Sequence, residues 1–391
     1  MACGYISSND ERLYAGLELV YGQVPEIQSA SRFPAVKLRA RQVLERPKRR
    51  DKTGTRTYVG TPANLRRKTT FGLTTYMTAW TRQDSEPGYG TLFQACLGRA
   101  PLLFEGGVAG ENTNAKLLRF DREHGLEEGQ AVTFGGELRF VISIVDGATV
   151  ELNAPFSMLP GAGAPIGPTV TYAPATDVPT VSIFDYWSPA GAVNRIISGA
   201  AMERLRVTVN GDYHEFEFSG AAKDIIDSTS FVAGQGELSA FPPEPVLDAF
   251  DYTIIPGHLG QAWLGNTPDQ FHTITAAELT LENDIDLRTN EFGSDSPECI
   301  TAGPRTVTLD FDLFELNDAA TKGLYQAARQ SSPIAAMFQL GQQAGQLFGA
   351  YMKSVVPEVP EFEDSETRLL WRFSGARAQG TGDDELFVAF G

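Results

Sequence analysis

The sequence has little cysteine or histidine and no long apolar run, and these shortages exclude several classes of protein. The three cysteines lie far apart in the 391 residues, so neither a disulfide framework nor a CxxC metal pair is expected (Cys3, Cys96 and Cys299). The four histidines show no metal-ligand spacing. No apolar run approaches the roughly 18 residues that a membrane span needs. The start, MACGYISSNDER, lacks an apolar core, so we expect no signal peptide and no membrane partner.

The common catalytic motifs are also missing: the sequence holds no GxSxG, no Walker A motif and no HExxH. Residues 51–55 spell DKTGT, the motif in which P-type transport ATPases phosphorylate the aspartate. Those enzymes need membrane helices and a buried apolar strand before the aspartate, whereas Asp51 follows Pro47-Lys48-Arg49-Arg50. We therefore predict no enzymatic activity, no cofactor and no metal site.

The formal charge of −17, from 49 acidic and 32 basic residues, argues against general affinity for nucleic acid. Phosphate binding requires cationic groups that neutralise the backbone. The charge is still compatible with a wall along which nucleic acid slides without binding. The hydrophobic content of 42% is that of an ordinary globular protein. The length allows two or three domains.

The chain repeats itself. Phe218-Ser219-Gly220-Ala221 returns as Phe373-Ser374-Gly375-Ala376, an offset of 373 − 218 = 155 residues. Leu92-Phe93-Gln94-Ala95 returns as Leu324-Tyr325-Gln326-Ala327, an offset of 324 − 92 = 232 residues. The offsets differ by 232 − 155 = 77 residues, so one copy of a common unit carries an insertion of about that size. Two copies are too few for a solenoid, and they predict two like domains arranged side by side around a ring.

Alternating apolar and polar residues predict a mainly β fold with a helix in each copy. The first copy should hold strands at 35–44 and 69–80 and a helix at 91–97, and residues 13–20 resemble a weak helix. The second copy should hold strands at 273–281 and 306–316 and a helix at 318–330, with Asn317 as its N-cap. The predicted domains are a discontinuous first domain (1–100 and 181–232), a small inserted β-domain (101–180), a linker (233–270) and a second domain (271–391).

The clearest hairpin is predicted over residues 202–218, because Asn210-Gly211 favours a type I′ turn. That turn would place Leu205 opposite Phe216 on one face. On the other face it would pair Arg206 with Glu215 and Arg204 with Glu217, each pair contributing roughly 0.2–1 kcal/mol.

Equivalent loops of the two copies carry opposite charge. Residues 45–56 hold six basic residues, which are Arg46, Lys48, Arg49, Arg50, Lys52 and Arg56. Residues 282–298 hold six acidic residues, which are Glu282, Asp284, Asp286, Glu291, Asp295 and Glu298. The basic run could be a solvated charge cluster, or it could contact nucleic acid, although it lacks aromatic residues for base stacking. The interpretation that we favour is that the two loops set the angular register between stacked rings, because complementary charge gives specificity.

Several segments resemble the tail tube proteins of long-tailed bacteriophages: Arg12–Leu38, the strand–long loop–strand of residues 35–80, the helix Tyr89–Leu97 and the hairpin Met202–Ala222 that ends in FSGA. The resemblance covers both copies and most of the chain outside 101–180. It implies a β-sandwich or barrel-like sheet with a flanking helix in each copy, and rings in which the sheets of neighbouring subunits join into one inner barrel. A long loop of each subunit would reach the next ring. Most members have one domain and form sixfold rings, so two domains imply three chains in a pseudo-sixfold ring.

This resemblance implies a structural protein of a virus tail, assembled in the host bacterial cytoplasm. Its stacked rings would conduct double-stranded DNA during ejection without binding it specifically. Its partners would be further copies of itself and other tail proteins, namely the tape measure, terminator and distal tail proteins. The candidate residues facing the lumen are Asp310, Asp312, Glu215 and Glu217. Two alternatives stay open: a ring used once per particle, such as a tail terminator or baseplate hub, and a carbohydrate-binding or adhesion module suggested by the inserted domain.

Overall fold

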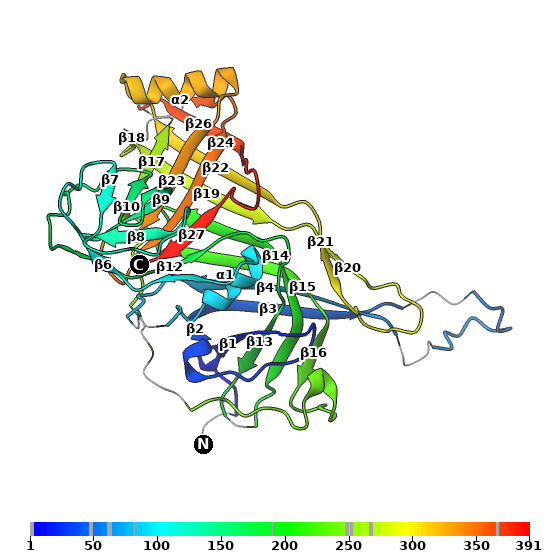
Figure 1. Cartoon of the computed structure of the whole chain (residues 1–391). Helices are drawn as coiled ribbons and strands as arrows, with labels where there is room; N and C mark the ends of the chain where they lie inside the picture. Colours follow the sequence, from blue (N-terminus) through cyan, green and yellow to red (C-terminus); the bar gives the residue numbers. More distant parts are fainter. Residues whose placement is uncertain are drawn as a thin grey trace.

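The structure is a computed structural model that describes residues 4–46, 50–60, 65–81, 83, 85–189, 191–246, 250, 253–265, 269–364 and 367–391. The chain is mainly β, as the sequence predicts, with two α-helices among these residues. Its main feature is a large curled antiparallel sheet (Figure 1). Neither helix in the described part of the chain has the length and apolar run that crossing a bilayer requires.

Eight strands form one continuous layer, which we call the front sheet. In spatial order they are β3 (Ala35–Leu44), β4 (Arg67–Tyr76), β15 (Glu215–Ala222), β14 (Arg195–Val209), β19 (Ile274–Glu282), β22 (Thr306–Phe314), β26 (Leu370–Ala378) and β25 (Glu361–Glu363). All neighbours are antiparallel, and the layer curls through the middle of the molecule (Figure 1).

The two halves of the front sheet have the same strand order. In the first half the order is β3-β4-β15-β14, and in the second it is β19-β22-β26-β25. Each half places a helix after its second strand: α1 (Gly90–Leu97) in the first and α2 (Ala319–Gln330) in the second. Both first strands also carry a bulge, between Ala35 and Lys37 in β3 and between Ile274 and Ala276 in β19. The pairing of β14 with β19 joins the halves.

A second layer lies behind each half. Behind the first half it contains β2 (Arg32–Phe33), β1 (Arg12–Leu17), β13 (Val181–Tyr186), the start of β14 and β16 (Asp224–Asp227). Behind the second half it contains β18 (Asp269–Gln270), β17 (Gly260–Gly265), β23 (Ile334–Leu340), β24 (Phe348–Val356), β27 (Phe387–Phe390), β12 (Thr169–Tyr172) and β5 (Leu102–Phe104). Each half is therefore a two-layered sandwich.

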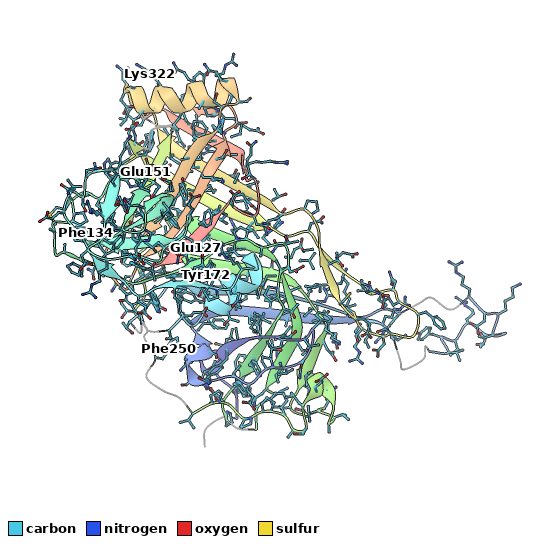
Figure 2. All side chains as sticks on the ribbon, in the orientation of Figure 1. Glu127, Phe134, Glu151, Tyr172, Phe250 and Lys322 are labelled. Atoms are coloured by element: carbon cyan, nitrogen blue, oxygen red, sulfur yellow. The ribbon has the colours of Figure 1, made fainter. Side chains whose placement is uncertain are left out.

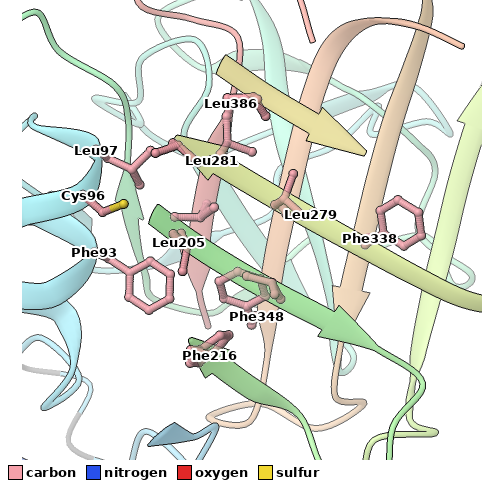
Figure 3. Packing of buried hydrophobic residues seen from close by; sticks show 14 of the residues in the cluster. Phe93, Cys96, Leu97, Leu205, Phe216, Leu279, Leu281, Phe338, Phe348 and Leu386 are labelled. Atoms are coloured by element: carbon pink, nitrogen blue, oxygen red, sulfur yellow. The ribbon is translucent and has the colours of Figure 1, made fainter. Parts of the chain in front are cut away.

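One hydrophobic core runs through both halves. Figure 3 shows Phe93 and Leu97 of α1 packed near Leu205 and Phe216 of the first half and Phe348 of the second. All of these side chains are buried. Since burying one large apolar side chain contributes about 1.5–3 kcal/mol, this shared core holds the halves together as one body.

The inserted segment builds its own small sheet of β7 (Leu117–Arg119), β10 (Thr149–Leu152), β9 (Glu137–Asp146) and β8 (Ala131–Phe134), beside the pair β6 (Gly107–Val108) and β11 (Pro165–Ile166). Gly135 and Gly136 both have positive φ, as the two-residue hairpin turn between β8 and β9 requires. The segment has a separate apolar cluster that includes Phe104, Phe120 and Phe156.

The inserted segment also packs against the second half of the chain. Leu138 and Phe140 share a buried cluster with Trp263, Met337 and Tyr351. Figure 2 labels Glu151 of β10 and Phe134, which packs against Phe156 inside the segment. The insertion interrupts the first copy in sequence, but through this cluster it packs against the second.

Arg139 fixes this contact. Its side chain is fully buried, and its guanidinium donates to the carbonyls of Leu138 (2.7 Å) and Pro155 (2.8 Å) and to Gln261 Oε1 (3.2 Å). It lies 5.0 Å from the ring of Trp263, and Glu137 Oε2 is 3.4 Å away. Burial lowers the pKa of Arg139 to about 10.

Three predictions of local structure are wrong or incomplete. Residues 13–20 do not form a helix: β1 runs over Arg12–Leu17 and is buried along its middle because strands flank it on both sides. The helix of the second half begins at Ala319, and its N-cap is Asp318, whose side chain accepts from the Thr321 N–H, instead of Asn317. The predicted linker, 233–270, contains β17 and β18.

The predicted register of the hairpin is also wrong, by two residues. Leu205 lies opposite Phe218, and Arg206 lies opposite Glu217. Asn210 has the positive φ of a type I′ turn, but Gly211 does not, so the turn is not of this type. Residues 213 and 214 instead bond to the segment around Ile255, through a bridge of Tyr213 to Pro256 and the His214 N–H to the Ile255 carbonyl. This tertiary pairing lengthens the loop to residues 210–214.

The remaining elements are short: the 3₁₀ helices η1 (Ser8–Asp10), η2 (Ser29–Ser31) and η3 (Gln235–Glu237), and the hairpin of β20 (Ile285–Leu287) with β21 (Ile300–Ala302). The segment from 231 to 244 crosses the back of the first half. There Glu244 accepts from the Arg12 guanidinium, with the closest atoms 2.5 Å apart, and Phe231 and Phe241 pack against the cluster of Tyr14 and Phe184.

Candidate assembly interface

The two long loops of opposite charge lie side by side in one chain. They project together from one edge of the molecule as an arm, formed by the connection of β3 to β4 and by the β20–β21 hairpin (Figure 1). Arg66 donates to Asn290 Oδ1 (3.2 Å) and to the Glu291 carbonyl (3.3 Å). The Arg67 N–H donates to the Asp295 carbonyl (2.8 Å), and its guanidinium reaches the Asp295 carboxylate (3.0 Å).

The basic residues that the sequence singles out lie on the exposed part of this arm. Arg46, Arg50, Lys52 and Arg56 are all exposed. Lys48 and Arg49 lie outside the described residues. The residues that contact the acidic loop, Arg66 and Arg67, lie beyond residues 45–56, where β4 begins.

Of the six predicted acidic residues, two are exposed and four have a partner within the chain. Asp284 and Asp286 are exposed, Glu291 pairs with Arg288, Asp295 pairs with Arg67, and Glu298 Oε1 accepts from the Ser294 hydroxyl (2.7 Å). Glu282 is a correction, because it is not in the loop. It ends β19, where it forms an ion pair with Arg204 of the first half. Part of the acidic charge is therefore neutralised within the chain.

Both loops carry bare apolar side chains. Phe292 is 107% exposed, and Tyr58 and Val59 are 72% and 57% exposed. A large aromatic side chain held in water at the end of a projecting loop is a common anchor for a protein contact. The charge pattern drew attention to these loops in the sequence, but it gave no sign of their apolar tips.

The four candidate lumen residues lie on one face of the front sheet, the face opposite the core. In β22, Val307, Leu309, Phe311 and Leu313 are buried, so Asp310 and Asp312 point the other way. Phe216 and Phe218 are likewise buried in β15, which leaves Glu215 and Glu217 on that same face. We call this face the polar face.

The environment of these four carboxylates differs. Asp310 Oδ1 accepts from the Gly375 N–H (2.5 Å). Asp312 Oδ2 lies 3.7 Å from Arg372, yet burial raises its pKa. Glu217 pairs with Arg206 at 3.3 Å. Burial, followed by the charges of Glu217 and Asp212, raises the pKa of Glu215.

The polar face is charged with both signs, and it is not a uniformly acidic wall. Arg206 bridges Glu217 and Glu278, and Arg204 pairs with Glu282. The edge strand β3 adds three exposed cations, which are Lys37, Arg39 and Arg41. On this face β15, β19 and β22 carry carboxylates, whereas β14 and β3 carry cations.

The two edges of the front sheet were not singled out by the sequence. Among the described residues, β3 pairs with β4 alone and β25 with β26 alone, so each has one side without a strand partner. The alternating cations of β3 were a usable signal, because charged residues protect open edges from uncontrolled pairing. An open edge at each end of a curled sheet is a surface to which another copy can add a strand.

Potential metal ligands do not cluster in the described part of the chain. No group of three or more His, Cys, Asp or Glu side chains there could hold a metal ion. His214 is buried, with Nε2 3.0 Å from the Leu259 carbonyl, and burial lowers its pKa. Asp51 of the DKTGT sequence is exposed on the arm.

Comparison with known proteins does not assign this chain to a family. No protein-family model matches the chain, and no curated protein matches it. Function must therefore be argued from the arrangement of the sheet, its edges and the arm.

Proposed function

We propose that this protein is a structural subunit that polymerises, three chains to a ring, and that the rings stack into the tube of a virus tail through which DNA passes. The observation that carries the proposal is the front sheet. Two units of equal strand order already join edge to edge within one chain, and the outer edges of both units are open. A protein that joins two of its own units in this way can join further units across chains.

The curvature and size of the sheet suit a channel. Each chain supplies eight strands to the front sheet, so three chains would supply about 24. With strands about 4.8 Å apart and tilted by about 40°, the barrel would have a backbone diameter of about 48 Å. Side chains extend about 5 Å from each wall, half the spacing of packed sheets. The remaining bore is wider than a DNA duplex.

The chemistry of the polar face suits a passage more than a binding site. Its arginines on β14 are engaged by carboxylates, as Arg206 is by Glu217 and Glu278. Cations that are already paired release fewer counterions from DNA, so they give little affinity. DNA that contacts such a wall would slide instead of stopping. The exposed cations of β3 lie at an edge of the sheet.

The arm supplies the contact between rings. It projects from the sheet, carries exposed Arg50, Lys52 and Arg56, and presents Tyr58 and Phe292 to solvent. Charged loops with apolar tips fit a contact in which charge guides the approach and buried aromatic rings hold the complex. A subunit of a single ring, such as a terminator or hub, has less need for such an arm on every chain.

The inserted segment gives the adhesion alternative its main support, because it has its own core. However, its inner side is joined to the second half through Arg139 and the cluster around Trp263 and Tyr351. We infer that it braces the two halves on the outside of the ring. Binding of the full chain to a glycan array would favour adhesion instead.

Electron microscopy of the purified protein tests the proposal. Long uniform tubes with threefold symmetric, pseudo-sixfold rings are the expected result. Single rings would favour the terminator or hub alternative. A monomer at all concentrations and salt conditions would refute assembly, and six chains per ring by native mass spectrometry would refute the trimer.

A further inference from the structure

The junction between the two halves shows how one unit pairs with the next. Across it, Arg204 lies opposite Glu282, Arg206 opposite Thr280 and Thr208 opposite Glu278 on the polar face. Arg204 forms an ion pair with Glu282, and Arg206 forms one diagonally with Glu278. On the core side, Val207 lies opposite Leu279, and both are buried.

The outer edges can be aligned with this junction residue by residue. Glu361 opposes Arg372 in the second half as Arg206 opposes Glu217 in the first, so β25 corresponds to the end of β14 with an offset of 155 residues, from 361 − 206. Leu38 opposes Leu73 as Ala277 opposes Phe311, so β3 corresponds to β19 with an offset of 239 residues, from 277 − 38. The equivalent bulges in β3 and β19 support the second alignment.

We infer that β25 of one chain adds antiparallel to β3 of the next chain in the register of the internal junction. This inference rests on the proposed ring assembly and specifies its contact. The opposite residues would be Glu361 with Arg41, Glu363 with Arg39, Val359 with Val43, and Phe362 with Ala40.

The outer edges differ from the internal junction at these positions, and both members of each opposing pair differ together. Where the internal junction has the ion pair Arg204–Glu282, the outer edges have Val359 and Val43, which are 47% and 42% exposed. Two apolar side chains left in water at matching positions are explained if they cover each other.

The charged pairs change in the same concerted way. Glu361 and Arg41 replace Arg206 and Thr280, and Glu363 and Arg39 replace Thr208 and Glu278. Opposite charges directly across an antiparallel pair stabilise it, and like charges destabilise it. A slip of one residue would move these side chains to the other face of the sheet and lose both charge pairs.

The residues on the core side of the inferred contact are also complementary in size. Phe362 stacks on Trp371, with ring centroids 5.2 Å apart, but it is 56% exposed. Its counterpart in the first half, Val207, is 1% exposed because Leu279 covers it. In the inferred contact a large residue meets a small one, Phe362 on Ala40, in place of the medium-sized pair Val207 and Leu279.

This contact is heterologous, since different surfaces of the two chains meet. Such contacts produce rings when the rotation closes and filaments when it does not. The cations of β3 would be neutralised by the carboxylates of the neighbouring β25. This removes the strip of exposed positive charge on which DNA would otherwise be held.

A cysteine pair tests the register directly. In the variant Val43→Cys with Val359→Cys, the two Cα atoms would lie about 4.5–5.5 Å apart across the contact, within the range of a disulfide. Oxidation of the assembled protein should produce covalent trimers on a non-reducing gel. The matched control, Val36→Cys with Val359→Cys, places the second thiol about 23 Å along the strand and should stay monomeric on the gel.

Charge exchange gives an independent readout. Arg41→Glu and Glu361→Arg should each abolish ring formation while the monomer stays folded by circular dichroism, and the double variant Arg41→Glu/Glu361→Arg should restore rings. If the wild-type protein forms rings, but the cysteine variant does not cross-link and the double charge variant does not restore rings, the register is overturned and the proposed function stands. Wild-type chains that never form rings would refute both.

Discussion

Asn283 donates from its side-chain amide to the main-chain carbonyl of Cys96, over 2.8 Å. The same amide donates to the Met202 carbonyl (2.9 Å). Asn283 is 2% exposed and follows β19 of the second half, whereas Cys96 lies in α1 of the first. One buried side chain therefore satisfies two carbonyls at the end of the junction between the halves.

Replacing Asn283 by alanine should destabilise the whole chain. Both carbonyls would lose their donor, and an unsatisfied buried polar group costs about 1–3 kcal/mol. Urea unfolding should show a lower midpoint with an unchanged slope. The control Asn317→Ala, at an exposed position, should change the unfolding free energy by less than about 0.5 kcal/mol. Equal stability of the two variants would show that Asn283 does not hold the junction.

Arg139→Ala should loosen the inserted segment. The substitution removes a buried cation that contacts Glu137, Pro155 and Gln261, and breaking a buried pair costs about 3–5 kcal/mol. Limited proteolysis should then cut within residues 101–180 before the rest of the chain. Arg122→Ala is the control, because that side chain is 89% exposed. Identical proteolysis of the two variants would argue against the bracing role.

The raised pKa of Glu11 predicts that the free energy of unfolding changes between about pH 4.5 and 7. Burial, and then the nearby charge of Asp185, raise the pKa of Glu11 from 4.5 to about 7. The folded state thus holds a proton that the unfolded chain releases, so this contribution to stability is complete below pH 4.5 and is lost as the pH rises to 7. Since Glu11 is partly exposed, screening by solvent limits the effect to about 1 kcal/mol or less.

Glu11→Gln should remove this dependence, because an amide keeps an N–H donor for Asp185 but does not titrate. Thermal unfolding followed at pH 5 and pH 8 should show a smaller difference in midpoint than in the wild type. A difference as large as that of the wild type would assign the titration to another group.

Reversing the charge of the arm should impair stacking without unfolding the chain. Arg50 and Lys52 are exposed, so Arg50→Glu/Lys52→Glu leaves the core untouched, while surface charge contributes mainly to the rate and specificity of association. We expect shorter tubes at low salt, measured by electron microscopy. Arg122→Glu on the inserted segment is the matched control. Tubes of normal length from the arm variant would exclude a role for these charges in stacking.

The aromatic tips should act differently from the charges. Phe292→Ser and Tyr58→Ser remove side chains that are 107% and 72% exposed in the single chain. The unfolding free energy of the monomer should therefore change by less than about 0.5 kcal/mol. If these aromatic side chains are buried between subunits, tubes of the variants should disassemble at a lower dilution than wild-type tubes. Unchanged tube stability on dilution would place the tips outside the contact.

Much of the local structure could be predicted from the sequence because it depends on neighbouring residues. The strand at 35–44 and the turn at Gly135-Gly136 follow from alternation and from glycine at positions of positive φ. The helix after β22 was predicted within one residue. Two short repeats were enough to suggest two similar units.

The errors arise where distant segments compete with local preference. Asn210-Gly211 favours a two-residue turn, but pairing of Tyr213 and His214 with residues 255 and 256 lengthens the loop and shifts the register by two. Residues 13–20 were assigned a weak helix, yet β2 and β13 enclose Arg12–Leu17 as a strand.

The sequence alone determined the mainly β character, the opposite charge of the two loops and the alternation that places Asp310 and Asp312 away from the core. The tertiary structure decided which strands are neighbours, which two edges stay open and where the insertion docks. The physical reason is that side-chain alternation specifies the face on which a residue lies, whereas strand partners are selected by contacts between residues far apart in the chain. Only the folded sheet could therefore bring Arg204 to Glu282, and leave Val43 and Val359 exposed at opposite edges.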